Sequence, residues 1–361
     1  MNRIELDFEN YLQDIVRNRE FPYDFLLSLD DCVIMVKTNS SGLKNILVNY
    51  FQTFVVSENQ QWDITVKALE TSPVRPGLKL ENKMPESGKK RIKEQYADLN
   101  SGRIIRKKLT SMLFYFNSQD NLAIGQCEKN HNQVINFINS RFIQWKLDQG
   151  CLLCHAAAVA NKKLGLILAG FSGMGKSTLA LHQMNQDLTF VSNDRLMVEK
   201  TDSGLRMFGV PKLPRVNPGT ILNNPSLISI LSAEEHEKFR EIDPAKIWEI
   251  ECKYDVFLDE CFGPGKFNLS SGVAGLVILN WQRTGQPTQF RRVDLANRPD
   301  LLETVMKSPG LFYVSEPETK PRAQAMQTRE YIELLSSCPV YEISGGIDFV
   351  EASRKCCELI A

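Results

Sequence analysis

Residues 170–177 read Gly-Phe-Ser-Gly-Met-Gly-Lys-Ser, a complete G-x-x-x-x-G-K-[ST] phosphate-binding motif. Glycines let the backbone take positive φ values and approach a ligand closely. Successive N–H groups can then point into one concavity at the positive end of a helix, where phosphate binds. Lys176 can reach the β- and γ-phosphates, and the Ser177 hydroxyl is a ligand for Mg²⁺. The motif therefore predicts that the chain binds a nucleoside triphosphate with Mg²⁺. The residues expected to contact it are Gly170, Ser172, Gly173, Met174, Gly175, Lys176, Ser177 and Thr178.

The residues on either side fit this motif. Residues 164–169 form an apolar run typical of a buried strand, and residues 177–184 predict the first turns of a helix. Strand, glycine loop and helix are the context that the motif requires. A chance match in a glycine-rich turn is the alternative, and the flanking pattern disfavours it.

A carboxylate that helps to hold the metal is expected near the loop. The next apolar strand ends at Ser192 and is followed by Asn193 and Asp194. A right-handed crossover would bring this strand back alongside the loop strand, so that Asp194 emerges at the carboxyl edge, where ligands bind in such sheets. The alternative is that the Asn-Asp pair only caps a turn.

His155 lies inside an apolar stretch, where a polar ring must find a partner. The strand that contains it precedes the loop strand in sequence, so the ring could face the phosphates. A histidine satisfied within the core is the alternative, and the spacing alone does not decide between them.

Composition limits the classes of function. The 361 residues are 43% apolar, enough for a substantial core, and basic and acidic residues balance at 43 each. A neutral chain gives no overall attraction to nucleic acid or to a membrane surface. No run of 18 apolar residues and no apolar leader is present. With nine cysteines and no leader, we expect reduced thiols and a cytoplasmic location.

The pattern changes near residue 150, where alternating strands and helices begin. We predict a smaller α+β domain over residues 1–150, which could recruit the substrate, and an α/β phosphate-loop domain over residues 151–361. Predicted helices cover residues 43–55, 131–147, 177–184, 331–335 and 350–359. Predicted strands cover residues 62–68, 109–117, 121–126, 152–159, 164–169, 188–192, 276–280 and 340–343.

Several motifs together resemble the HPr kinase/phosphorylase family. They are His155-Ala-Ala-Ala-Val, the glycine loop with its Gly-x-Ser-Gly-x-Gly-Lys-Ser pattern, and Phe190-Val-Ser-Asn-Asp. The chain is most similar to the group called HPr kinase-related kinase B. That likeness rests on Arg103-Ile-Ile-Arg-Lys-Lys, Asn132-Gln-Val-Ile-Asn-Phe-Ile-Asn, Lys212-Leu-Pro-Arg-Val-Asn-Pro-Gly-Thr and Lys253-Tyr-Asp-Val, and it extends from about residue 100 to the C-terminus.

The resemblance implies an ATP- and Mg²⁺-dependent kinase for Ser or Thr of a small protein, with a fold related to phosphoenolpyruvate carboxykinase. It implies that Lys176 holds phosphates, that Ser177 and Asp194 serve Mg²⁺, and that His155 lies beside the catalytic acids. Arg215 is the counterpart of the arginine in the family's Glu-x-Arg-Gly signature, which is otherwise missing here. The related kinases form rings, but no sequence feature identifies an interface, so a homo-oligomer stays open.

Asn193 departs from the family, which has Asp at this position as the base that takes the proton of the acceptor hydroxyl. An amide cannot accept that proton at neutral pH. We therefore expect that phosphorolysis, the reverse transfer to inorganic phosphate, is lost and that kinase activity uses Asp194. Two alternatives remain: a kinase of the same fold for a small molecule, and a regulatory nucleotide-binding module with little turnover.

Weaker signals have two interpretations each. Lys212, Arg215 and Asn217 could contact substrate or only stabilise a turn, and Arg283 could sense the γ-phosphate or form a structural pair. For the basic segment 81–108 we expect a solvated face rather than a site for an acidic partner. For the acidic cluster of Glu251, Asp255 and Asp259 we expect a solvated face rather than a second metal site. For Cys151 and Cys154 we expect buried thiols rather than a redox or metal-binding pair.

Overall fold

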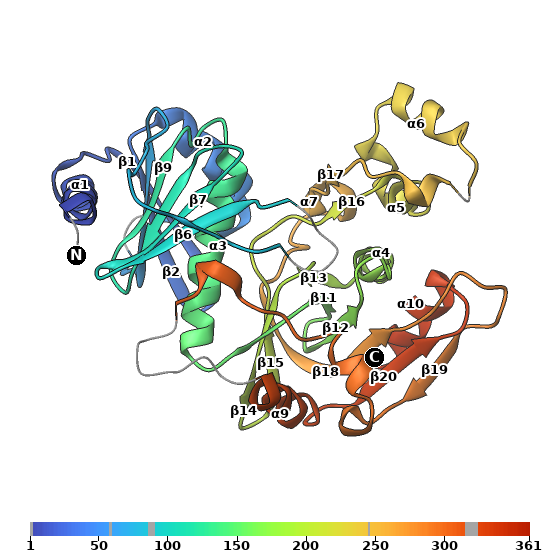
Figure 1. The fold of residues 1–361 in the computed structure, drawn as a ribbon. Coiled ribbons are helices and arrows are strands. Elements are labelled where there is room, and N and C mark those ends of the chain that lie inside the picture. The colour runs from blue at the N-terminus through green and yellow to red at the C-terminus, as the bar shows by residue number, and fades with distance from the viewer. Residues whose placement is uncertain (1–2, 58–59, 86–90, 245, 315–323) are drawn as a thin grey trace. The chain divides into compact units, whose positions relative to one another are not determined.

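A computed structural model describes residues 3–57, 60–85, 91–244, 246–314 and 324–361. The fold is mixed α/β with two large sheets, one in each of two compact units (Figure 1). The first unit runs to Trp145 and also takes in residues 309–314, and the second begins at Lys146. The sequence placed a boundary at residue 150, within the turn that follows the helix crossing this division. None of the described helices is long and apolar enough to cross a membrane.

The first unit is built on a nine-stranded sheet in the order β3-β1-β2-β4-β9-β8-β7-β6-β5. Its strands are antiparallel except for the pairs β2–β4 and β4–β9, which are parallel. The bounds are α1 Arg3–Asn18, β1 Tyr23–Leu29, β2 Cys32–Thr38, α2 Ser41–Tyr50, β3 Val55–Val56, β4 Ile64–Glu70, β5 Glu81–Asn82, β6 Glu94–Leu99, β7 Gly102–Lys107, β8 Leu113–Phe116, β9 Asn121–Gly125 and α3 His131–Asp148.

Both faces of this sheet are covered because its central strands are apolar on both sides. On β8, Leu113 and Tyr115 join a core with residues of α1, whereas Phe114 and Phe116 contact Phe137 of α3. Alternate side chains of a strand point to opposite faces, which accounts for this division. The basic segment of this unit is partly paired, as expected for a surface: Arg103 bonds to Asp98, and Lys83 and Lys107 bond to Glu94. Its Lys89 and Lys90 lie outside the described residues.

The second unit is built on a second nine-stranded sheet. Seven strands follow the order β10-β14-β15-β18-β12-β11-β13, and β20 pairs with both β18 and β19. The strand bounds are β10 Leu152–Cys154, β11 Ala156–Ala160, β12 Leu164–Gly170, β13 Thr189–Ser192, β14 Leu196–Thr201, β15 Gly204–Phe208, β18 Ser270–Leu279, β19 Gln289–Arg292 and β20 Val340–Ser344, with β16 Arg215–Val216 and β17 Tyr254–Asp255 in a separate pair. The helix bounds are α4 Lys176–Gln183, α5 Pro218–Leu222, α6 Ala233–Arg240, α7 Leu258–Phe262, α8 Pro299–Leu302, α9 Gln324–Leu335 and α10 Phe349–Glu358.

Strand β12 has buried side chains on both faces, and each face has its own core. Leu166 and Leu168 pack in a core with residues of α4 and α10, whereas Ile167 packs in a second core with residues of α8 and α9. A continuous apolar run, rather than an alternating one, is the pattern of a strand covered on both sides. The run at residues 164–169 is therefore explained by its central place in the sheet (Figure 1).

Two sequence predictions about this unit are wrong. Residues 152–159 are not one strand, because the chain leaves β10 at Cys154, the His155 N–H bonds to the Val305 carbonyl, and β11 begins at Ala156. The strand after the loop helix does not lie alongside the loop strand either. Strand β13 pairs with β11, and β11 lies between β13 and β12 as an antiparallel strand.

Cys151 and Cys154 are both buried within this unit. Burial raises the pKa of the Cys154 thiol to about 12, and a protonated thiol is a poor nucleophile. The structure thus agrees with the interpretation of the C-x-x-C motif as a pair of packing residues.

Candidate functional site

Three chain segments with polar side chains meet at one edge of the second sheet. Strand β12 ends at Gly170 and β13 ends at Ser192, and β11, which is antiparallel to both, begins between them. His155 precedes β11, so it lies at the same edge as the residues that follow β12 and β13. The carboxyl ends of strands are where open α/β sheets bind ligands. The inserted strand therefore brings His155, the glycine loop and Asp194 together.

The glycine loop, residues 170–177, makes a tight turn between β12 and α4. Gly173 and Gly175 have φ values of +85° and +84°, a region that residues with a Cβ avoid. A Cβ at Gly175 would also lie 2.7 Å from a ring carbon of Phe349. Gly175 is the N-cap of α4, and the first N–H groups of a helix have no partner within it. The first N–H groups of α4 thus lie beside the loop at a positive helix end, the arrangement that binds anions.

Lys176 is buried beneath this loop, with an exposed fraction of 8%. Its ammonium donates hydrogen bonds to the carbonyls of Gly170, at 2.7 Å, and Phe171, at 3.3 Å. Burial lowers the pKa of Lys176 to about 8, although Asp194 acts in the opposite direction. A buried ammonium whose hydrogen-bond partners are neutral carbonyls is stabilised when an anion binds beside it.

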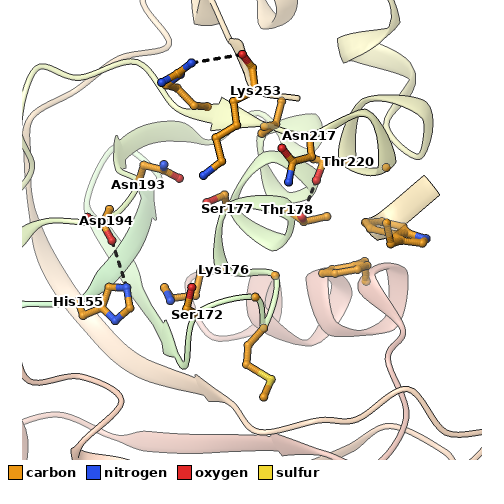
Figure 2. Close-up of a pocket in the computed structure, with 18 of the residues that line it drawn as sticks. His155, Ser172, Lys176, Ser177, Thr178, Asn193, Asp194, Asn217, Thr220 and Lys253 are labelled. Atoms are coloured by element: carbon orange, nitrogen blue, oxygen red, sulfur yellow. Dashed lines mark hydrogen bonds and ion pairs between the residues drawn. The ribbon is translucent and has the colours of Figure 1, made fainter. Parts of the chain in front are cut away.

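Asp194 is held between the side chains of His155 and Lys307. One oxygen of its carboxylate lies 3.1 Å from His155 Nε2 (Figure 2). The other oxygen lies 3.1 Å from Lys307 Nζ. Burial opposes the charge of this carboxylate, but the hydrogen bond from His155 and the charge of Lys307 outweigh it and hold the pKa of Asp194 well below its usual range. Asp194 is therefore a stable anion, suited to holding a cation and weak as a proton acceptor.

The set of oxygen donors fits magnesium. Figure 2 shows the Ser177 hydroxyl and the Asp194 carboxylate among the side chains around the pocket. Magnesium usually takes one or two carboxylates, with phosphate oxygens and waters completing its shell. In the described part of the chain no group of three His, Cys, Asp or Glu side chains could hold a metal alone. Ser177 and Asp194 could hold magnesium if phosphate oxygens and waters supplied its other ligands.

Two asparagine oxygens in this pocket have unused hydrogen-bonding capacity. The Oδ1 atoms of Asn193 and Asn217 are buried and find no hydrogen-bond partner among the described residues. Asn217 is the N-cap of α5, yet its side chain makes no capping bond. Buried polar atoms are normally paired, so both oxygens are positioned to accept from a ligand. The hydroxyl of Thr178, in contrast, is already bonded to that of Thr220, at 2.8 Å.

These residues line one pocket of about 870 Å³, contained in the second unit. This volume is at the upper end of the range for small-molecule sites. Trp248 and Phe349 form an aromatic part of its wall, with their ring centroids 6.2 Å apart and the planes inclined by 21°. The Arg283 guanidinium lies 5.8 Å from the Trp248 ring. Aromatic faces beside a guanidinium can take a flat heterocycle by stacking.

The structure gathers most of the sequence candidates into this pocket. All residues of the glycine loop from Ser172 line it, together with His155, Asn193, Asp194, Lys212, Arg215, Asn217 and Arg283. Gly170 instead accepts the bond from Lys176 at the base of the loop. The acidic cluster is not among the described residues that line the pocket: Asp255 pairs with Arg215 at 3.1 Å, and Asp259 accepts the backbone N–H of Lys266.

Sequence reasoning missed four residues that shape this site. Lys307 contacts Asp194, and Lys253, Trp248 and Phe349 line the pocket. Lys253 belongs to a segment that carried the family resemblance, so a signal for it existed. The others lie far from the loop in sequence and in no motif.

Comparison with known proteins gives little. No protein-family model and no curated protein matches this chain. Among solved structures, the chain is similar to the HPr(Ser) kinase/phosphatase from Coxiella burnetii, with 11% identity over 57% of this chain and 98% of that one, and with a TM-score of 0.27. A likeness of that size carries no argument, and the functional conclusions therefore rest on the residues of the site.

Proposed function

We propose that this protein is an ATP- and Mg²⁺-dependent kinase that transfers the γ-phosphoryl group to a hydroxyl, with Ser or Thr of a small protein as the acceptor. The observation that carries the proposal is the meeting of the glycine loop, Lys176 and Asp194 at one sheet edge and in one pocket. The acceptor class comes from the sequence motifs shared with HPr kinase-related kinase B.

The chain's own groups would position the phosphates. The backbone donors of the glycine loop and the Lys176 ammonium supply positive charge, and the ammonium is hydrogen-bonded to the neutral carbonyls of Gly170 and Phe171. Phosphoryl transfer depends mainly on such positioning and charge neutralisation. Ser177 and Asp194 would hold Mg²⁺, which when bound neutralises charge on the phosphate oxygens.

In the transfer, the acceptor oxygen forms a bond to the γ-phosphorus as the bond to the bridging oxygen breaks. ADP leaves with that electron pair, and the hydroxyl proton passes to Asp194. The low pKa of Asp194 makes it a weak base, but a loose transition state asks little of the base. The unpaired Oδ1 of Asn193 can accept a hydrogen bond from the hydroxyl and orient it.

One observation favours a second candidate, a regulatory nucleotide-binding module with little turnover. The family's base position holds Asn193, and the remaining carboxylate, Asp194, is engaged by both His155 and Lys307. Such a module would bind ATP through the same loop and would label no acceptor.

Incubation with γ-labelled ATP, Mg²⁺ and a lysate of the native host tests the proposal. We expect the wild type to label a small protein and Asp194→Ala to lose the labelling by about 100-fold or more, because the variant lacks the carboxylate that would hold the metal. Binding of ATP by the wild type without any labelled product would replace the kinase by the regulatory module. Failure of the wild type to bind ATP would exclude both.

Asn193→Asp provides a separate prediction about the direction of phosphoryl transfer. We expect the wild type to perform no phosphorolysis, and the variant to release pyrophosphate from inorganic phosphate and the labelled acceptor, because the new carboxylate can exchange the proton. Asn193→Ala, which removes the amide without adding a base, is the control and should stay inactive in this direction. A variant with Asp at 193 that releases no pyrophosphate would contradict the explanation.

A further inference from the structure

The charged groups that line the pocket are strongly unbalanced. Among the described residues that line it are six cationic side chains and a single carboxylate, that of Asp194. The cationic side chains are Lys176, Arg195, Lys212, Arg215, Lys253 and Arg283. The chain as a whole is neutral, so this excess is a local property of the pocket. It favours anionic ligands there.

The single carboxylate does little to neutralise these groups. Asp194 already contacts His155 and Lys307. The Arg215 guanidinium pairs with Asp255, but both side chains are about half exposed, so solvent weakens their attraction. The pKa of Lys212 is lowered, first by burial and then by the charge of Arg195, with Asp194 acting in the opposite direction. Arg215 also lowers the pKa of Lys212 and Asp255 raises it, so charges of both signs lie near this lysine.

Arg215 belongs to β16, and Lys253 directly precedes β17, the strand that pairs with it. Strands β16 and β17 are antiparallel, with Arg215 opposite Asp255 and Val216 opposite Tyr254. The Arg215 guanidinium also donates to the Lys253 carbonyl, at 3.3 Å. Figure 2 shows the Lys253 side chain extending into the pocket from this pair, whereas Lys176 belongs to the glycine loop across the pocket. We call Lys212, Arg215 and Lys253 the basic wall.

The phosphates of a nucleotide account for only part of this positive charge. Magnesium neutralises part of the charge of a nucleoside triphosphate, and the glycine loop with Lys176 faces what remains. Arg283 lies at the aromatic part of the pocket, over Trp248. The basic wall is thus left beside the position of the acceptor, where Asn193 and Asn217 present their unpaired oxygens.

We propose that the basic wall binds a second anion, a phosphate or carboxylate group that the acceptor carries next to the hydroxyl to be phosphorylated. This inference rests on the proposed function, since it assigns the remaining space of the same pocket. In a protein acceptor the anion is an acidic or phosphorylated residue beside the target Ser or Thr. In a small acceptor it is the molecule's own phosphate or carboxylate.

Titration calorimetry with inorganic phosphate tests the wall directly. With the loop saturated by Mg²⁺ and a non-hydrolysable ATP analogue, we expect the wild type still to bind phosphate. Lys253→Ala should weaken phosphate binding by about 10-fold or more, because a charge-assisted contact is lost, and should change affinity for the analogue by less than about 3-fold. Lys238→Ala, which removes an exposed lysine of α6 outside the pocket, should change neither.

Competition between the ATP analogue and inorganic phosphate for one site would overturn the inference. If the analogue abolishes phosphate binding, the only anion site is the glycine loop, and if Lys253→Ala binds phosphate as the wild type does, the wall is not a site. The same titration on Lys176→Met without nucleotide separates this failure from that of the proposed function. Phosphate retained by this variant supports the wall even if no nucleotide binds to the protein, and phosphate lost from it counts against the wall.

The labelling experiment with the lysate also shows whether a protein or a small molecule carries the anion. After labelling, ultrafiltration separates small molecules from proteins. A labelled compound in the filtrate other than ATP and inorganic phosphate identifies a small acceptor, and label retained by the filter identifies a protein acceptor. In both cases we expect inorganic phosphate to compete with the acceptor. We also expect Lys253→Ala to raise the KM for the acceptor by about 10-fold. Labelling that is insensitive to both changes would contradict an anionic acceptor.

Discussion

Lys176→Met should reduce affinity for Mg²⁺–ATP by about 100-fold or more while leaving the unliganded protein folded. Methionine keeps the apolar stem of lysine and loses the ammonium, which is the charged group at the base of the glycine loop. Interactions of a positioned donor with a phosphate are strong because both partners are charged and partly desolvated. Calorimetric titration with the nucleotide measures the loss.

Stability gives an independent check on the same substitution. Burial lowers the pKa of Lys176 to about 8, so the folded state carries this charge at a cost when no anion is bound. The unfolding free energy of unliganded Lys176→Met should therefore not fall by more than about 1 kcal/mol. Lys163→Met, at the exposed opposite end of the loop strand, is the matched control and should bind nucleotide normally. Equal nucleotide affinity in both variants would remove the loop from the proposed site.

The glycine loop could be located from sequence because everything that defines it is contiguous. The apolar strand, the three glycines, Lys176 and the following helix occupy residues 164–183, and the fold has them in that order. Positive φ values at Gly173 and Gly175 are also local requirements. Patterns of this kind need no knowledge of which strands pair.

Asp194 lies at the sheet edge that the sequence predicted, but the strand order from which we predicted it was wrong. From the sequence, β13 was expected directly beside β12, whereas β11 lies between them. The edge is still shared because two antiparallel pairings restore the direction of the strand. The same insertion bears on the open question about His155. The strand is interrupted at this residue, β11 begins at the sheet edge that the glycine loop and Asp194 share, and the ring contacts Asp194.

Lys212 and Arg215 of the basic wall were candidates from the sequence, whereas the positions of Lys253, Lys307 and Phe349 depend on how distant segments fold together. Lys253 directly precedes β17, Lys307 follows α8, and Phe349 begins α10. Each lies more than 50 residues from the glycine loop, and of the three only Lys253 belongs to a segment that carried the family resemblance. Only the folded chain brings these residues together.

Trp281 should be the residue on which the stability of the second unit depends most. Its side chain is almost fully buried, with 1% exposed, in the core that α4 and α10 share. Its indole N–H donates to the Met174 carbonyl at 2.9 Å, and its ring meets Phe349 edge to face at 5.0 Å. This single side chain joins the glycine loop to the core.

Trp281→Ala should lower the unfolding free energy by about 3–5 kcal/mol, since it removes a large aromatic side chain and leaves a cavity. Trp281→Phe keeps most of the packing and loses the bond to Met174, for which we expect a loss of about 1–3 kcal/mol. It should also weaken nucleotide binding, because the loop loses an anchor that lies outside the phosphate contacts. Urea unfolding followed by circular dichroism measures the losses, with Trp62→Ala, 47% exposed in the first unit, as a control expected to cost under about 1 kcal/mol. If Trp281→Phe binds nucleotide as tightly as the wild type, the loop is held by its glycines and Lys176 alone.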